Sequence, residues 1–189
     1  VSNLAELTID AVYARGQCLS DAGRLTAEMP EFTYPASSRG TVKMKRDLQA
    51  SDFRIEVPGK SGKLRANVIG VVENQAPTKA LERDVDIVDG VAQMDRERDI
   101  CQIALVERHR EKGTVVNGLV SGFGYDKACA VASTVAHDSH HMIVVGTSHE
   151  DMALAANRLR EVGGGVCVFH EGKEIALVEL PIAGLISDE

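Results

Sequence analysis

Short segments of apolar or alternating residues, separated by turn signals, recur along most of the chain and constrain its fold more than any other feature. Alternation of apolar and polar residues is typical of a half-buried strand, and a β-branched apolar run is typical of a buried one. Such segments lie at residues 8–14, 17–20, 53–57, 64–72, 84–91, 100–106, 115–120, 129–135, 142–145, 166–169 and 175–178. Asp89-Gly90 and Glu171-Gly172 are turn signals that fit hairpins. The pattern therefore predicts a mostly antiparallel β-sheet.

Residues 148–162 carry the signals of a long helix. Ser148 is a favourable N-cap, Glu150 and Asp151 stand in the first turn, and Gly163 can form the left-handed C-terminal cap. Residues 127–132, rich in small side chains, fit a helix as well as a strand. We therefore expect an α+β fold: a mostly antiparallel β-sheet with a few packed helices, preceded by an orphan β-hairpin.

The length of 189 residues allows one domain, or one domain with a small appendage, and is too short for a (β/α)₈ barrel of about 250 residues. The hairpin near the N-terminus would be marginal alone, so we expect it to pack against something else. Residues 29–50 contain Pro30, Pro35 and Gly40 and predict a connector. The expected organisation is therefore a hairpin region at 1–28, a connector at 29–50 and a main domain at 51–189. Because the chain lacks an initial Met, we expect it to belong to a longer protein.

The composition argues against several classes of protein. A net charge of −7 and the absence of Trp argue against a nucleic-acid partner. No apolar run approaches the roughly 18 residues of a membrane span, and the first residues lack the basic region of a signal peptide. The four cysteines have no metal-binding spacing, which predicts reduced thiols in a cytoplasmic protein.

The densest group of titratable side chains is the segment His137-Asp138-Ser139-His140-His141, which we call the His turn. On a helix, His137 would share a face with His140 and His141, and the three could hold a metal. The apolar segments on both sides favour strand–turn–strand instead, where the side chains diverge. From the residues alone, a functional loop and an ordinary polar turn capped by Asp138 stay equally open.

A second candidate group, Glu107-Arg108-His109, closes the strand expected at 100–106. It could place an ion pair and an imidazole at a strand end, or it could be a solvated strand terminus. Gly122-Phe123-Gly124 is glycine-rich but does not continue as a dinucleotide-binding motif. The sequence also has no Gly-x-Ser-x-Gly motif and no plausible Cys/His nucleophile pair.

Several ordered motifs resemble the C-terminal region of bacterial adenine deaminases, which belong to the amidohydrolase superfamily. The resemblance covers about residues 50–186 and departs from the common pattern at His141, where Asn is usual, and at Ala128-Cys129, where Gly is usual. The segments that carry it are 106–109, 120–124, 132–141, 143–147, 150–153, 157–159, 163–165 and 180–185.

The resemblance implies that residues 1–28 end the small β-domain flanking the amidohydrolase barrel, and that 51–189 form the family's C-terminal domain. It implies an enzyme that hydrolyses adenine to hypoxanthine and ammonia at a binuclear manganese or iron centre in the upstream barrel. No metal is expected within this chain, which would be inactive alone. The implied partners are adenine, the upstream barrel and further copies of the protein as a homo-oligomer, with no nucleic acid and no membrane, in the cytoplasm.

The resemblance places supporting catalytic roles on His137, Asp138 and His140, and substrate-binding roles on Glu107, His109 and Ser139. The His turn would help to close the purine pocket or position its groups. Two alternatives stay open. One is a self-contained metal-binding hydrolase that uses His137, His140 and His141. The other is a non-catalytic module for oligomerisation or ligand sensing.

Overall fold

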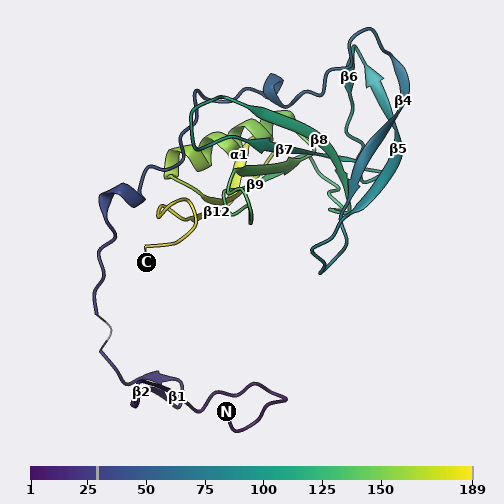
Figure 1. Cartoon of the computed structure of the whole chain (residues 1–189). Coiled ribbons are helices and arrows are strands. Elements are labelled where there is room, and N and C mark those ends of the chain that lie inside the picture. Colours follow the sequence, from purple (N-terminus) through teal and green to yellow (C-terminus); the bar gives the residue numbers. More distant parts are fainter. Residues whose placement is uncertain (29, 189) are drawn as a thin grey trace. The chain divides into compact units, whose positions relative to one another are not determined.

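The computed structural model describes residues 1–28 and 30–188, which divide into two compact units, Val1–Thr33 and Tyr34–Glu189 (Figure 1). Met29, where the predicted connector begins, and Glu189 lie outside the described residues. Each unit is described by itself.

The smaller unit is an antiparallel sheet with the strand order β1 (Ala11–Ala14), β2 (Gln17–Asp21) and β3 (Arg24–Leu25). Arg15 and Gly16 both have positive φ, as the two-residue hairpin turn between β1 and β2 requires. The predicted hairpin is therefore present, and a short third strand extends it. None of its described residues, 1–28 and 30–33, is buried.

The larger unit is built on a nine-stranded sheet with the order β12-β11-β9-β10-β7-β8-β4-β5-β6. All neighbouring strands pair antiparallel except β4 and β8, which pair parallel through Ile69 with Val120 and Gly70 with Ser121. The predicted mostly antiparallel α+β fold is confirmed. The strands are β4 (Gly62–Gly70), β5 (Lys79–Val88), β6 (Val91–Ala92), β7 (Cys101–Val106), β8 (Val115–Ser121), β9 (Cys129–Ser133), β10 (Met142–Gly146), β11 (Gly165–His170) and β12 (Lys173–Glu179).

Capping residues near the ends of the main helix determine where it begins and ends. The α-helix α1 (His149–Val162) is capped by Ser148, whose Oγ accepts from the Asp151 backbone N–H at 3.2 Å, and it ends at Gly163 with φ of 84°. Two short 3₁₀ helices, η1 (Ala36–Ser38) and η2 (Ala50–Phe53), precede the sheet. Residues 129–133 form a strand, so the helical alternative for 127–132 is wrong. Residues 53–57, expected as a strand, make only an isolated bridge between Glu56 and Val91.

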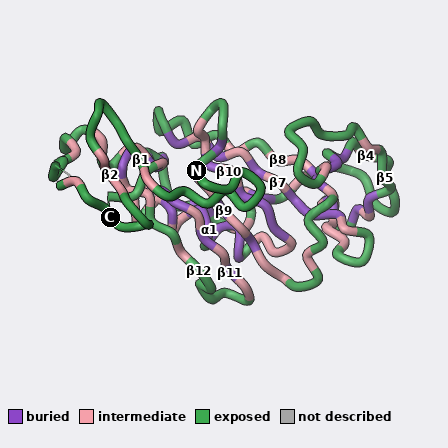
Figure 2. Tube along the Cα trace, turned by 90° about the horizontal axis from the view of Figure 1, so that it is seen from below, coloured by how far each residue is buried: buried purple, intermediate pink, exposed green. Residues whose placement is uncertain are grey.

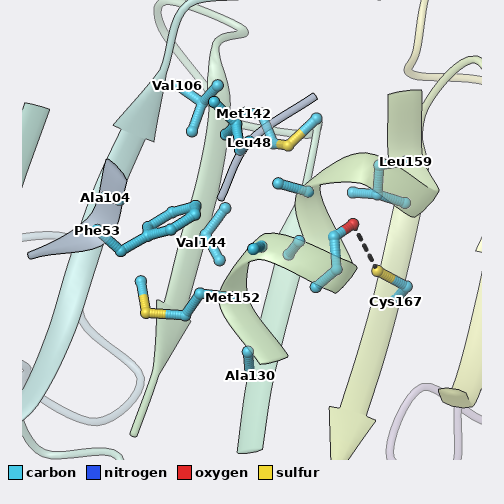
Figure 3. Packing of buried hydrophobic residues seen from close by; sticks show 14 of the residues in the cluster. Leu48, Phe53, Ala104, Val106, Ala130, Met142, Val144, Met152, Leu159 and Cys167 are labelled. Atoms are coloured by element: carbon cyan, nitrogen blue, oxygen red, sulfur yellow. Dashed lines mark hydrogen bonds between the residues drawn. The ribbon is translucent and has the colours of Figure 1, made fainter. Parts of the chain in front are cut away.

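The main hydrophobic core lies between α1 and one face of the sheet (Figure 3). Met152 and Leu159 of α1 pack there with Met142 of β10 and Phe53 of η2. The Cys167 thiol donates to the Ala155 carbonyl at 3.3 Å. Residues 34–50, most of the predicted connector, belong to this unit, and their Val42, Met44 and Leu48 are buried in the same core.

A second cluster joins the hairpin of β4 and β5 to the rest of the sheet. Val68, Val85 and Ile87 of the hairpin pack with Ile100 and Leu119. Much of β4 and β5 is exposed, whereas buried residues gather along α1 and the strands beside it (Figure 2). The sheet therefore has two hydrophobic centres, and the candidate site lies near the one that α1 covers.

Candidate functional site

The His turn connects β9 to β10, as the strand–turn–strand interpretation predicts. Because β10 also pairs antiparallel with β7, Met142 at the start of β10 lies beside Val106 at the end of β7. The His turn and the loop after β7 therefore meet at the same end of the sheet. The topology brings together the two candidate groups that the sequence singled out separately.

The two loops touch through His109. Its Nε2 lies 3.1 Å from the Ser139 carbonyl oxygen, and its ring lies 4.8 Å from the ring of His141, tilted by 44°. Beside this contact is an open hollow of about 450 Å³ lined by Glu107, His109, Arg110, Lys112 and His141. Two imidazoles and two cationic side chains thus border one space.

Glu107 organises its own loop. Its carboxylate oxygens accept hydrogen bonds from the backbone N–H groups of His109 and Arg110, both at 2.7 Å, and of Lys112 at 2.9 Å. Desolvation raises the pKa of Glu107, but the three N–H donors outweigh it, and the pKa lies below its ordinary value. Glu107 is therefore an ionised acceptor whose oxygens are already engaged.

Arg108 is a buried residue that sequence reasoning did not single out for a role. Its side chain is 1% exposed, and burial lowers the pKa of its guanidinium. Nε donates to the His140 carbonyl at 2.6 Å, and Nη2 donates to the carbonyls of Thr134 at 3.4 Å and Ala183 at 3.3 Å. Among the described residues it makes no ion pair. Arg108 thus holds the backbone of the His turn and of the C-terminal loop from inside the protein.

Gly184 permits this arrangement. Its φ is +72°, and a Cβ on it would lie 2.9 Å from Nη1 of Arg108. The Thr134 hydroxyl donates to the Gly184 carbonyl at 2.6 Å, which joins the C-terminal loop to the start of the His turn. A pattern in the sequence pointed to this site: Ala104, Val106 and Arg108 alternate, so Arg108 lies on the strand face that is buried.

The predicted catalytic residues have different surroundings. His137 and Asp138 are 99% and 96% exposed and contact each other at 2.9 Å between Nδ1 and Oδ1. His140 has φ of 50°, and its backbone N–H donates to the Ala136 carbonyl at 2.7 Å. The Nδ1 atoms of His140 and His141 are buried without a hydrogen-bond partner among the described residues. The structure thus brings Glu107, His109, Ser139 and His141 together and leaves His137 and Asp138 projecting from the turn.

The residues do not fit a binuclear metal centre. In the described part of the chain, no group of three or more His, Cys, Asp or Glu side chains is arranged to hold a metal ion. Nor do the buried thiols offer a nucleophile, because burial raises the pKa of both Cys101 and Cys167 to about 12.

Comparison with known proteins identifies relatives for the whole chain. A family model described as the adenine deaminase C-terminal domain matches residues 75–189. The chain is 58% identical over 189 residues to the adenine deaminase of Mesorhizobium japonicum, and 58% identical over 188 residues to adenine deaminase 3 of Rhizobium meliloti. It is 41% identical to the adenine deaminase of Moorella thermoacetica. It is covered fully in these matches but spans only 31% of each relative's length.

Within residues 1–28 and 30–188, no helix is both long enough and apolar enough to cross a bilayer.

Proposed function

Because the chain belongs to the adenine deaminase C-terminal domain family, we propose that it is the C-terminal part of an adenine deaminase, which hydrolyses adenine to hypoxanthine and ammonia. The observation that carries this proposal is the 58% identity to an adenine deaminase over the whole chain. The hydrolytic centre, a binuclear manganese or iron site, would lie in an upstream barrel, since the residues present here do not fit it. Adenine, the barrel and further copies of the protein are the partners, and the cytoplasm is the location.

Within such an enzyme, this domain would support the purine pocket. The hollow beside His109 and His141 has a volume within the range of about 300–1,000 Å³ found for ligand sites. It is open, so another surface must close it before it can exclude water. The His turn projects His137 and Asp138 from the same end of the sheet, where they can reach across such a junction.

The role proposed for each residue follows from whether its side chain is already engaged within the domain or is exposed. Glu107 fixes the loop that carries His109, and the Ser139 carbonyl orients the His109 ring. His140 contributes through its backbone, which Arg108 holds, while His137 and Asp138 have free faces for contacts with substrate or barrel. Residues 1–28 would end the small β-domain and 51–189 would form the family domain, with residues 34–50 packed into the same unit as that domain.

The metal-hydrolase alternative has less support. His137, His140 and His141 lie within five residues of one turn, yet they form no ligand set among the described residues. The His137 side chain is almost fully exposed, whereas the Nδ1 atoms of His140 and His141 are buried. The three rings therefore lie in different surroundings, which does not favour a shared metal ion.

A segment exchange tests the proposal. The segment of the Mesorhizobium enzyme that matches this chain is replaced by residues 1–189, and hypoxanthine formation is followed by absorbance. We expect the exchanged enzyme to be active, and the isolated chain to release no hypoxanthine with added Mn²⁺ or Fe²⁺. A folded but inactive exchanged enzyme, or an active isolated chain, would contradict the proposal.

A variant in the exchanged enzyme then tests the site. His109→Ala should raise KM for adenine, because it removes the ring that borders the hollow. The matched control is His170→Ala, since His170 lies on β11 outside the hollow. Equal effects of both variants would speak against a substrate-binding role of His109.

A further inference from the structure

The hollow beside His109 carries positive charges that the proposed substrate does not use. Its lining residues are Glu107, His109, Arg110, Lys112 and His141. Adenine is an uncharged base near neutral pH, so it offers no negative charge to the guanidinium and the ammonium at this space. Two permanent cations at one hollow point to a ligand group of the opposite charge.

The one carboxylate in the lining is already occupied. The Glu107 oxygens accept hydrogen bonds from the backbone N–H groups of His109, Arg110 and Lys112. Glu111, the other acid of this loop, is exposed and is not part of the lining. Among the described residues, the charged side chains at the hollow that have no partner are therefore Arg110 and Lys112.

A second cationic segment lies against the same loop. Lys45 passes over Gly113, where a Cβ would lie 3.0 Å from Cδ of Lys45. Earlier in that segment, the backbone N–H of Lys43 donates to the Arg108 carbonyl at 2.8 Å. Both lysine side chains are exposed, and within the described part of the chain neither forms an ion pair. In a chain of net charge −7, this local surplus of positive charge attracts an anion.

We propose that the hollow binds a phosphate group, held by Arg110 and Lys112. A phosphate presents several charged oxygens, of which a planar guanidinium can hold two and an ammonium another. The rings of His109 and His141 border the same hollow, 4.8 Å apart and tilted by 44°. Imidazole rings can stack on a planar base. The lining thus combines cations for a phosphate with rings for a base.

Such a phosphate has two possible sources. Inorganic phosphate would contact only the cations, whereas a purine nucleotide would also place its base beside His109 and His141. The hollow of about 450 Å³ has the size of a site for an organic ligand, which favours the nucleotide. This inference deepens the proposed function, on which it rests for a purine ring beside His109. A nucleotide bound in this way would compete with adenine.

Titration of the isotope-labelled 189-residue chain, followed by NMR of its backbone amides, tests the proposal. The probes are inorganic phosphate, adenosine monophosphate and adenine, each at an ionic strength held constant with chloride. We expect both phosphate compounds to shift the amides of residues 109–112. The nucleotide should bind about tenfold or more tightly than inorganic phosphate, because its base adds a stacking contact.

A pair of variants locates the bound phosphate. Arg110→Gln with Lys112→Gln should weaken binding of both phosphate compounds about tenfold or more, because two charge-assisted contacts are lost. The matched control is Lys60→Gln with Lys63→Gln, which changes the net charge equally at exposed positions outside the lining. The control should bind the nucleotide like the unmodified chain. Amide spectra without ligand verify that both variants are folded.

The other outcomes overturn the proposal. If neither phosphate compound shifts these amides more than chloride does, the hollow does not bind phosphate. If the test variant binds phosphate like the unmodified chain, the anion binds elsewhere, and if test and control are weakened equally, overall charge is the cause. Adenine that binds as tightly as the nucleotide would exclude a contribution of the phosphate. Equal binding of inorganic phosphate and nucleotide would identify free phosphate as the ligand and overturn the nucleotide. These measurements need no deaminase activity, so the segment exchange tests the proposed function separately.

Discussion

The two loops that meet at the hollow are stabilised in opposite ways. The loop after β7 is held from within, because the Glu107 carboxylate binds three N–H groups of its own loop. The His turn is held from outside, because Arg108 binds the His140 and Thr134 carbonyls from beneath. The Glu107 side chain is engaged by its own loop, whereas the His137 and Asp138 side chains of the His turn are 99% and 96% exposed. His137 and Asp138 are therefore available for contacts, and Glu107 is not.

The largest effect is expected for Arg108→Met. Loss of the guanidinium leaves the buried Thr134 carbonyl and the half-buried carbonyls of His140 and Ala183 without this donor, and should destabilise the larger unit by about 2–4 kcal/mol. Urea unfolding followed by circular dichroism measures the change. The control Arg110→Met removes an exposed guanidinium and should change stability by less than about 0.5 kcal/mol. Equal effects would mean that the His turn is not held by Arg108.

A smaller effect is expected for Glu107→Gln. The amide keeps one acceptor oxygen in place of two, and we expect a loss of about 1 kcal/mol after allowance for solvent screening. The amide protons of His109 and Arg110 should then exchange faster, while those of residues 137–141 stay unchanged. Faster exchange in both loops would show that they are not held separately.

The same carboxylate predicts a pH dependence. Because the pKa of folded Glu107 lies below its unfolded value, the stabilisation is complete above the unfolded pKa of about 4.3. It is lost as the pH falls through the folded pKa. Unfolding free energies measured from pH 7 to acid should fall less steeply in Glu107→Gln than in the unmodified chain. Parallel curves would contradict an ionised Glu107 in the loop.

The smallest effects are expected in the His turn itself. His141→Phe keeps the ring contact with His109 and removes a buried unpartnered Nδ1, so stability should rise by up to about 1 kcal/mol. His137→Ala removes a side chain that is 99% exposed and should change stability by less than about 0.5 kcal/mol. Thermal unfolding of both variants checks this order. A large loss in His137→Ala would show that the turn depends on its own side chains after all.

Local sequence signals predicted most helices and strands. They did not predict which distant strands pair with one another. Ser148, Gly163 and the Asp89-Gly90 turn act within a few residues, so the helix and the hairpin follow from the sequence. The position of β7 between β10 and β8 depends on pairing across distant segments. That position is what joins His109 to the His turn.

Local sequence signals also failed to predict which residues are buried. The segment with Pro30, Pro35 and Gly40 has the composition of a connector, yet Val42, Met44 and Leu48 fill the core beside α1. Arg108 is charged, and its segment was open to either an ion pair or a solvated strand terminus, but the residue is buried among carbonyls. In both cases tertiary packing outweighs the local preference, and composition alone does not reveal it.

The parallel contact between β4 and β8 has a consequence for how the molecule opens. Only Ile69 and Gly70 of β4 pair with β8, while β4 and β5 pair with each other along nine positions. Segments with few cross-links and exposed backbone open at a lower free-energy cost than the global unfolding reaction. Under native conditions, the amides of β4 and β5 should therefore exchange with solvent deuterium together and early, while those of β9 and β10 remain protected. The hairpin would behave as a separate cooperative unit, able to unfold and refold without disturbing the end of the sheet that bears the histidines.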